Sequence, residues 1–233
     1  MTAAAHPDWR VFASSDALAE GLADVVAAAL TEALKRRGKA FLALSGGTTP
    51  KRFFAALSRR SLDWSRVTVT LVDERFVGED SPRSNAALVR EALLTGAAAT
   101  ARFVPLYRPA ADVEAGAAEA SSVLSELPWP LDVAVLGMGI DGHTASFFPD
   151  ATDAAALDPN NPSTVAAVHA QSAGEPRLTL TLPRLVEAGL IAVHIEGAEK
   201  RVVLERALST EANLPVRRIF DHASHPVQVY WAP

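Results

Sequence analysis

A histidine and an aspartate stand two residues apart in the glycine-rich segment GMGIDGHTAS, residues 137–146. The segment follows the apolar run LDVAVL, so His143 and Asp141 are predicted to lie just beyond the end of a strand. A histidine can accept a proton near neutral pH. A lone loop histidine is usually structural or solvated, but a compact glycine-rich strand end favours a catalytic one. We therefore take His143 as a candidate general base, and Asp141 as the group that orients it or holds a substrate hydroxyl.

A second candidate segment, SGGTTP at residues 45–50, joins a predicted strand to a predicted helix. Glycines let backbone N–H groups approach a ligand closely, and the N-terminus of a helix attracts anions. Thr48 or Thr49 is expected to cap the helix, and Pro50 suits its first turn. A tight turn without a ligand would use the same residue types. The predicted anion-binding residues here are Ser45, Gly46, Gly47 and Thr48.

The charged residues Asp73, Glu74 and Arg75 begin the segment DERF, directly after the β-branched run VTVTLV. Charges at the end of a buried strand need partners or solvent. Arg75 is a candidate for binding phosphate or stabilising an oxyanion, and Asp73 for holding a sugar hydroxyl. A surface ion pair would account for the same residues, so DERF alone does not decide between these readings.

Two further cations are candidates for the same pocket. Arg177 begins the alternating segment RLTLTL, and Lys200 lies in the first turn of a helix predicted over 198–208. A cation in a first turn opposes the helix dipole, so Lys200 has no local stabilising role there. This favours a ligand-binding role for Lys200, although an ordinary exposed lysine is the alternative.

The pattern of elements indicates how these segments meet. Apolar and β-branched runs alternate with helical periodicity, which predicts an α/β fold with a doubly wound, mostly parallel sheet and helices on both faces, a Rossmann-like three-layer arrangement. In such sheets ligands bind outside the carboxyl ends of the strands. The predicted strands are 40–44, 67–72, 131–136, 164–170, 177–182, 190–197 and 226–232, and the predicted helices are 14–37, 50–57, 85–94, 112–127, 198–208 and a short one from Pro183.

The composition sets limits on domain number and partners. The 233 residues are 49% hydrophobic and 21% charged, which suits one large α/β domain, and we expect a single domain over residues 1–233. A formal net charge of −5 with scattered basic residues argues against a nucleic-acid groove. The N-terminus does not resemble a signal peptide, and no apolar run is long enough to cross a bilayer. We expect a cytoplasmic protein without a membrane or nucleic-acid partner.

Several cofactor classes are also disfavoured. The chain has no cysteine, which excludes disulfides, thiolate zinc sites and a cysteine nucleophile. No cluster has metal-ligand spacing, so we expect no metal. SGGTTP differs from the nucleoside-triphosphate motif GxxxxGK[ST], and no serine stands in a GxSxG elbow. GMGIDG has the spacing of a dinucleotide motif, but His143 and a Pro/Asn-rich loop follow where a helix should begin, so we regard the match as accidental.

The ordered set of motifs resembles the 6-phosphogluconolactonase family over essentially the whole chain. The segments are SGGTTP, VTLVDERFVGEDSPRSN, LGMGIDGHTASFFP, RLTLTLP and GAEKR. The resemblance implies hydrolysis of 6-phospho-D-glucono-1,5-lactone to 6-phospho-D-gluconate, in the oxidative pentose phosphate pathway, without any cofactor. The expected partner is therefore a small sugar-phosphate lactone, and we expect a monomer. Ile140 and Phe147 depart slightly from the family pattern, with consequences confined to loop packing.

The resemblance also suggests roles for the candidate residues. His143 would activate water and return the proton to the ring oxygen. Arg75 or the glycine-rich backbone would stabilise the oxyanion, and Asp73 and Asp141 would hold sugar hydroxyls or orient His143. The phosphate would lie against Gly46, Gly47 and Thr48, neutralised by Arg177 and Lys200.

Two alternatives remain at this point. The related glucosamine-6-phosphate isomerase/deaminases resemble DGHIAFNEP in this region and use a glutamate just before the proline, where this chain has Phe148. The missing carboxylate argues against ring-opening chemistry. A non-catalytic sugar-phosphate sensor would keep SGGTTP, Arg177 and Lys200 but would not need His143.

Overall fold

A computed structural model describes residues 7–209 and 213–233. Residues 1–6, on which the prediction about a signal peptide partly rests, lie outside this range. Seven strands form one sheet in which every neighbouring pair is parallel, which confirms the predicted doubly wound α/β fold. In spatial order the strands are β1 (Asp8–Val11), β10 (Gln228–Ala232), β9 (Leu190–Glu196), β6 (Val133–Leu136), β2 (Ala40–Leu44), β3 (Val67–Leu71) and β5 (Arg102–Phe103).

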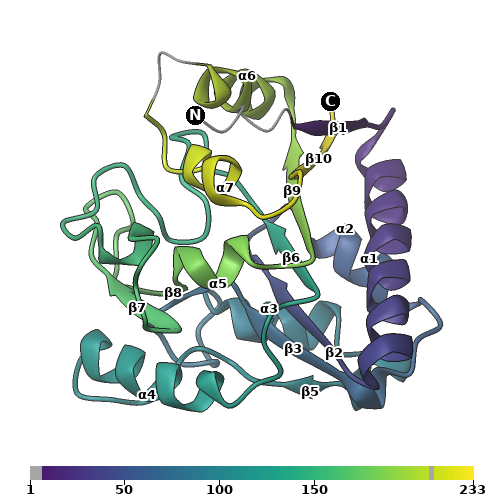
Figure 1. The fold of residues 1–233 in the computed structure, drawn as a ribbon, viewed down its shortest axis with the longest axis horizontal. Helices are drawn as coiled ribbons and strands as arrows, with labels where there is room; N and C mark the ends of the chain where they lie inside the picture. Colours follow the sequence, from purple (N-terminus) through teal and green to yellow (C-terminus); the bar gives the residue numbers. More distant parts are fainter. Residues whose placement is uncertain (1–6, 210–212) are drawn as a thin grey trace.

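Helices cover this sheet, and its central strands are buried along their whole length. In the view of Figure 1, α1 and α2 lie to the right of the central strands, and α4, α5 and α7 lie to the left. The helices are α1 (Ser15–Arg37), α2 (Lys51–Ser58), α3 (Asn85–Ala92), α4 (Val113–Ser125), α5 (Leu182–Val186), α6 (Ala198–Leu208) and α7 (Arg217–His222), with short 3-10 turns at Trp64–Arg66, Gly96–Thr100 and Ala155–Leu157. Continuous apolar strands such as AFLAL suit a sheet covered on both faces.

A second sheet differs from the sequence expectation. The segments predicted as strands over 164–170 and 177–182 form β7 (Val165–Val168) and β8 (Arg177–Leu180), which are antiparallel to each other and do not join the large sheet. The third strand, β4 (Asp73–Arg75), is formed by the start of the DERF segment, for which the sequence predicted no strand, and it pairs with β8. This pairing places Asp73 and Arg75 on regular backbone.

The helix ends partly follow the predictions. Gly38 ends α1 with a φ of 72°, and its N–H donates to the Leu34 carbonyl at 2.9 Å, as expected for a C-terminal glycine. Ser14 caps the start of α1, since its side-chain oxygen accepts a hydrogen bond from the Ala17 N–H at 3.2 Å. The expected threonine cap of α2 is wrong: the helix begins at Lys51 after Pro50, and no side chain caps it. The N-terminus of α2 therefore keeps free N–H groups near the SGGTTP turn.

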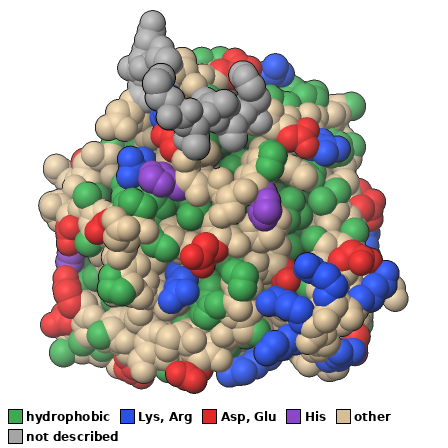
Figure 2. Space-filling model, viewed as in Figure 1, with side chains coloured by type: hydrophobic (Ala, Val, Ile, Leu, Met, Phe, Trp, Pro, Cys, Tyr) green, Lys and Arg blue, Asp and Glu red, His purple; other side chains and the backbone are tan. Residues whose placement is uncertain are grey.

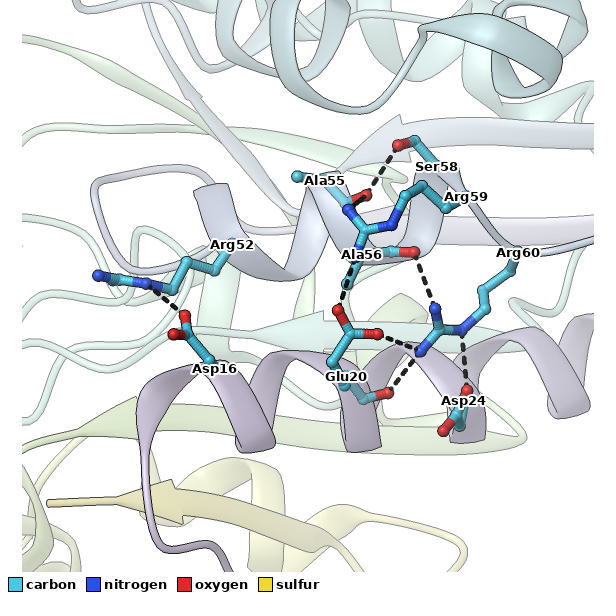
Figure 3. A network of polar contacts seen from close by, with 9 residues as sticks. All are labelled: Asp16, Glu20, Asp24, Arg52, Ala55, Ala56, Ser58, Arg59 and Arg60. Atoms are coloured by element: carbon cyan, nitrogen blue, oxygen red, sulfur yellow. Dashed lines mark hydrogen bonds and ion pairs between the residues drawn. The ribbon is translucent and has the colours of Figure 1, made fainter.

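Ion pairs fix α2 against α1, as Figure 3 shows. Arg60 bridges Glu20 at 2.7 Å and Asp24 at 2.8 Å, and Arg59 also pairs with Glu20. Near the SGGTTP turn, Arg52 pairs with Asp16 at 2.9 Å. Exposed pairs contribute only about 0–1 kcal/mol each. We therefore assign this network mainly to the orientation of α2, whose first turn follows the candidate anion-binding segment.

Besides β4 and the short 3-10 turns, the elements β1, β5 and α7 were not expected from the sequence. β1 and β5 are short strands at the two edges of the large sheet, and α7 has six residues and no capping side chain. Figure 2 shows Lys and Arg side chains gathered at the lower right, near the C-terminal end of α1, whose last turn carries Lys35, Arg36 and Arg37. Cations at that position interact favourably with the helix dipole, so their presence has a local explanation.

Candidate active site

A pocket of about 240 Å³ opens at the carboxyl ends of β2, β3, β6 and β9. The chain order reverses between β2 and β6, which is the position where doubly wound sheets bind their ligands. Nine of the ten candidate residues line this pocket, and the tenth, Asp141, contacts one of them. The nine are Ser45, Gly46, Gly47, Thr48, Asp73, Arg75, His143, Arg177 and Lys200.

His143 and Asp141 form a close pair in the loop after β6. His143 Nδ1 lies 2.6 Å from Asp141 Oδ1, and the His143 backbone N–H donates to the same oxygen at 3.1 Å. A carboxylate accepts only, so Nδ1 carries a hydrogen, and in the neutral ring Nε2 then has the lone pair. Nε2 has no hydrogen-bond partner among the described residues, and the His143 side chain is 32% exposed. The pair thus has the arrangement of an oriented general base.

The loop that carries this pair is held by its own backbone. The N–H of Gly137 donates to Ser45 Oγ at 2.9 Å, which ties the ends of β6 and β2 together. The N–H of Gly139 donates to the His143 carbonyl at 2.9 Å, and the N–H of Gly142 donates to the Gly139 carbonyl at 3.0 Å. All three glycine amides are therefore used inside the protein, which makes them poor candidates for binding an oxyanion.

Phe148 links the base to one of the candidate cations. Its ring centroid lies 4.5 Å from that of His143, and the Arg177 guanidinium lies over the same ring at 5.5 Å. Phe148 is buried. The position where the deaminases carry a glutamate is thus filled here by an apolar ring that supports both His143 and Arg177.

Arg75 and Arg177 are direct neighbours across the β4–β8 pairing. Arg75 donates to the Arg83 carbonyl and Arg177 to the Ala173 carbonyl, but neither forms an ion pair with a described residue, and the buried Nε of each has no partner there. Burial lowers the pKa of Arg177, and Arg75 lowers it further, against the opposing effect of Asp73. Like charges opposite one another destabilise a sheet, so two unpaired guanidinium groups here indicate an anion site.

Asp73 and Glu74 have different roles, which the sequence could not separate. Asp73 Oδ2 accepts a hydrogen bond from Ser146 Oγ at 2.7 Å, and Asp73 lines the pocket. Glu74 points away from it. Its carboxylate accepts backbone N–H groups of Arg75, Asn85 and Ala86 at 2.8–2.9 Å. Glu74 thereby anchors the N-terminus of α3. Burial raises the pKa of Glu74, and these hydrogen bonds oppose that rise.

Replacing Glu74 by alanine is expected to destabilise the fold by about 2 kcal/mol or more, because three backbone N–H groups, two of them buried, lose a charged acceptor. Chemical denaturation of both proteins measures this difference. Glu79→Ala is the control, since Glu79 forms only a surface pair with Arg90. An equal, small effect of the two substitutions would contradict the anchoring role.

The SGGTTP turn approaches α3 closely. A Cβ at Gly46 would lie 1.9 Å from Asn85 Oδ1, so only glycine fits without displacing Asn85. Asn85 lines the pocket, and its Nδ2 donates to the Asp73 carbonyl at 3.0 Å. Lys200 also lines the pocket; burial lowers its pKa, whereas Glu196 raises it. A partly buried cation in a pocket that a glycine-rich turn also lines suits an anionic ligand.

Among the polar residues that line the pocket, the sequence did not indicate a site role for Asn85 and His194. The only signal for Asn85 was its place at the end of the loop that begins with DERF. His194 stood inside a predicted strand, and a continuous apolar run does not indicate which face of a covered sheet a residue occupies. Within residues 7–209 and 213–233, no group of three or more His, Asp or Glu side chains is arranged to hold a metal ion. No helix in this part of the chain is long and apolar enough to span a membrane.

Comparison with known proteins places the chain in a family. The family described as glucosamine-6-phosphate isomerases/6-phosphogluconolactonase matches residues 13–231. The chain belongs to this family. It is 56% identical to a 6-phosphogluconolactonase of Mesorhizobium japonicum, over 97% of this chain and 95% of that one. A 6-phosphogluconolactonase of Rhizobium meliloti is 55% identical over 97% and 99% of the two chains.

A solved structure shares the fold throughout. A 6-phosphogluconolactonase from Shewanella baltica superposes with a TM-score of 0.95 at 38% identity, covering 99% of both chains. The family resemblance seen in the motifs is therefore confirmed.

Proposed function

We propose that this protein is an enzyme that hydrolyses 6-phospho-D-glucono-1,5-lactone to 6-phospho-D-gluconate. The observation that carries the mechanism is the His143–Asp141 pair, at 2.6 Å, in a pocket that also holds Arg75, Arg177 and Lys200. A lactone is an activated ester, so its hydrolysis needs a base for water, a donor for the oxyanion and a means of holding the substrate. The family and its lactonase relatives support this choice of substrate.

The reaction begins with water placed between His143 Nε2 and the lactone carbonyl carbon. Nε2 takes a proton as the water oxygen bonds to that carbon, and the carbonyl π electrons move to its oxygen. Asp141 stabilises the resulting imidazolium through Nδ1. When the carbonyl re-forms, the bond between C1 and the ring oxygen breaks, and His143 returns the proton to the ring oxygen. The new carboxylic acid then ionises.

Arg75 is the donor that we propose for the oxyanion. The sequence left open whether Arg75 or the glycine amides serve this purpose, and the amides of Gly137, Gly139 and Gly142 are already bonded. Arg75 lines the pocket, and its guanidinium group donates only to the Arg83 carbonyl and forms no ion pair with a described residue. Asp73, fixed by Ser146, is placed to hold a sugar hydroxyl.

The phosphate is assigned to the turn formed by Ser45, Gly46, Gly47 and Thr48, between Arg177 and Lys200. Free N–H groups at the uncapped start of α2 favour a dianion there. Binding a dianion far from the reacting carbon positions that carbon for attack. The site residues require no cofactor for this chemistry, and we propose a protein acting in the cytoplasm as a monomer.

The function is tested by generating the lactone in situ and following its decay with and without the protein. Spontaneous opening must be subtracted. The proposal requires decay well above background, and an unchanged decay rate would contradict it. Release of ammonia from glucosamine 6-phosphate would instead favour the isomerase/deaminase reaction, which the buried ring of Phe148 disfavours. Binding of 6-phosphogluconate without turnover would favour a sensor.

Replacing Arg177 by methionine is expected to raise KM for the lactone and Kd for 6-phosphogluconate by about tenfold or more, because a charge-assisted bond to the phosphate is lost. The change in kcat should be smaller. The control is Arg184→Met, since Arg184 stacks on Trp129 and does not line the pocket. A fall in kcat at constant KM would move Arg177 from phosphate binding to the chemical step.

A further inference from the structure

His194 is a buried titratable residue in the pocket wall that the proposed mechanism does not use. It lies in β9, is 3% exposed and lines the same pocket as Lys200. Its Nε2 lies 3.3 Å from Glu196 Oε1. Its Nδ1 has no hydrogen-bond partner in residues 7–209 or 213–233, and it is not among their fully enclosed, unpartnered atoms. Nδ1 is therefore an unused hydrogen-bonding position on a residue that lines the pocket.

Glu196 fixes the protonation of the other nitrogen. The hydrogen bond from His194 is the main cause that lowers the pKa of Glu196 to about 2, and Ser15 Oγ donates to Glu196 Oε2 at 2.6 Å. The carboxylate is ionised near neutral pH and accepts only, so Nε2 of His194 carries a hydrogen. Nδ1 is then a lone pair in the neutral ring and an N–H donor in the imidazolium.

The surroundings of His194 contain charges of both signs. Glu196 lies on the same strand, and Lys200 lines the pocket from α6. The positive charge of Arg52 of α2 contributes to the low pKa of Glu196. The remaining neighbours add no formal charge near neutral pH. They are Ser15 of α1 and the ring of Phe53 of α2, whose centroid lies 6.2 Å from that of His194. Tyr230, the register partner of His194 on β10, is also uncharged, because burial raises its pKa. The arrival of an anion is thus the event that shifts this balance toward the imidazolium.

We propose that His194 is a further phosphate-binding residue, which takes up one proton from solvent when the phosphate of the ligand binds. The imidazolium donates Nδ1–H to a phosphate oxygen and Nε2–H to Glu196, while Ser15 holds the carboxylate. This inference rests on the proposed function for the identity of the ligand. It adds a third cationic group to Arg177 and Lys200, one that becomes charged only when the phosphate is present.

Proton uptake gives this role a signature that a structural histidine lacks. The second pKa of a phosphate monoester is about 6, and a cationic site favours the dianion, so the ligand itself can only release protons on binding. Net uptake must therefore come from the protein. Burial lowers the pKa of Lys200, which also lines the pocket, so Lys200 needs its own control.

The experiment is calorimetric titration of the full chain with 6-phosphogluconate, between about pH 7 and 8, in buffers of different ionisation enthalpy. Wild type and Lys200→Met should both take up protons. His194→Asn keeps an N–H group near Nδ1 but cannot gain a proton, so its uptake should vanish and Kd should rise by about tenfold. Gluconate, which lacks the phosphate, should produce no uptake with any protein.

Equal uptake by wild type and His194→Asn, or its loss only in Lys200→Met, would overturn the assignment to His194. The ring signals of His194 in the wild-type NMR spectrum provide a second test that needs no folded variant. They should move to the imidazolium position when 6-phosphogluconate is added, and unchanged signals would also overturn it. Lactone turnover is measured separately: uptake without turnover would reject the proposed reaction alone, and turnover without uptake would reject the role of His194 alone.

Discussion

Replacing His143 by alanine is expected to lower kcat for lactone hydrolysis by about 10²–10⁴-fold, the usual contribution of a general base. The water then lacks its proton acceptor and the ring oxygen lacks its proton donor. KM should change little, because Arg177, Lys200 and the SGGTTP turn remain. The measurement is initial rates at saturating lactone, corrected for spontaneous opening, with circular dichroism to verify the fold.

Two further variants separate the chemistry from the packing. Asp141→Asn keeps the shape of the side chain but removes the charge that orients His143 at 2.6 Å, so it should lose activity in the same direction and to a lesser extent. His169→Ala is the matched control, because His169 pairs with Glu114 outside the pocket. If His143→Ala keeps the wild-type rate above background, another group activates the water.

The strand ends were predictable because they follow directly from local sequence. The runs AFLAL and LDVAVL mark buried strands, and the glycine-rich segments after them must lie at one edge of a parallel sheet. Local sequence thus predicts that Gly46 and His143 lie at the same edge of the sheet, and both residues line the pocket. The order of strands β6–β2–β3 then decides which strand ends become neighbours.

Long-range pairing was not predictable in the same way. Asp73–Arg75 is short and charged, and it becomes a strand only because β8, about a hundred residues later, lies beside it. That pairing opposes Arg75 to Arg177, which no local pattern indicates. The burial of Glu74 under the start of α3 likewise depends on tertiary contacts. The same holds for His194, whose face on the sheet is set by packing.

A substitution of Gly139 tests whether the position of the base matters as much as its presence. A Cβ at Gly139 would lie 2.3 Å from His143 Nδ1 and 2.5 Å from Asp141 Oδ1, so both members of the pair must move. Gly139→Ala is therefore expected to lower kcat by about 10²-fold, since a displacement of about 1 Å can have that effect. His143 and Asp141 are chemically intact in this variant, so the loss reports geometry alone.

Gly137→Ala is the matched control in the same loop. A Cβ there would meet Ser45 Cβ at 3.8 Å, an ordinary contact, so we expect a much smaller loss of activity. Thermal unfolding of both variants measures any effect on the fold, and kcat at saturating lactone measures the effect on chemistry. Similar losses in the two variants would mean that the loop backbone, rather than the placement of His143 against Asp141, limits the reaction. A large loss confined to Gly139→Ala would tie catalysis to a contact that only glycine permits.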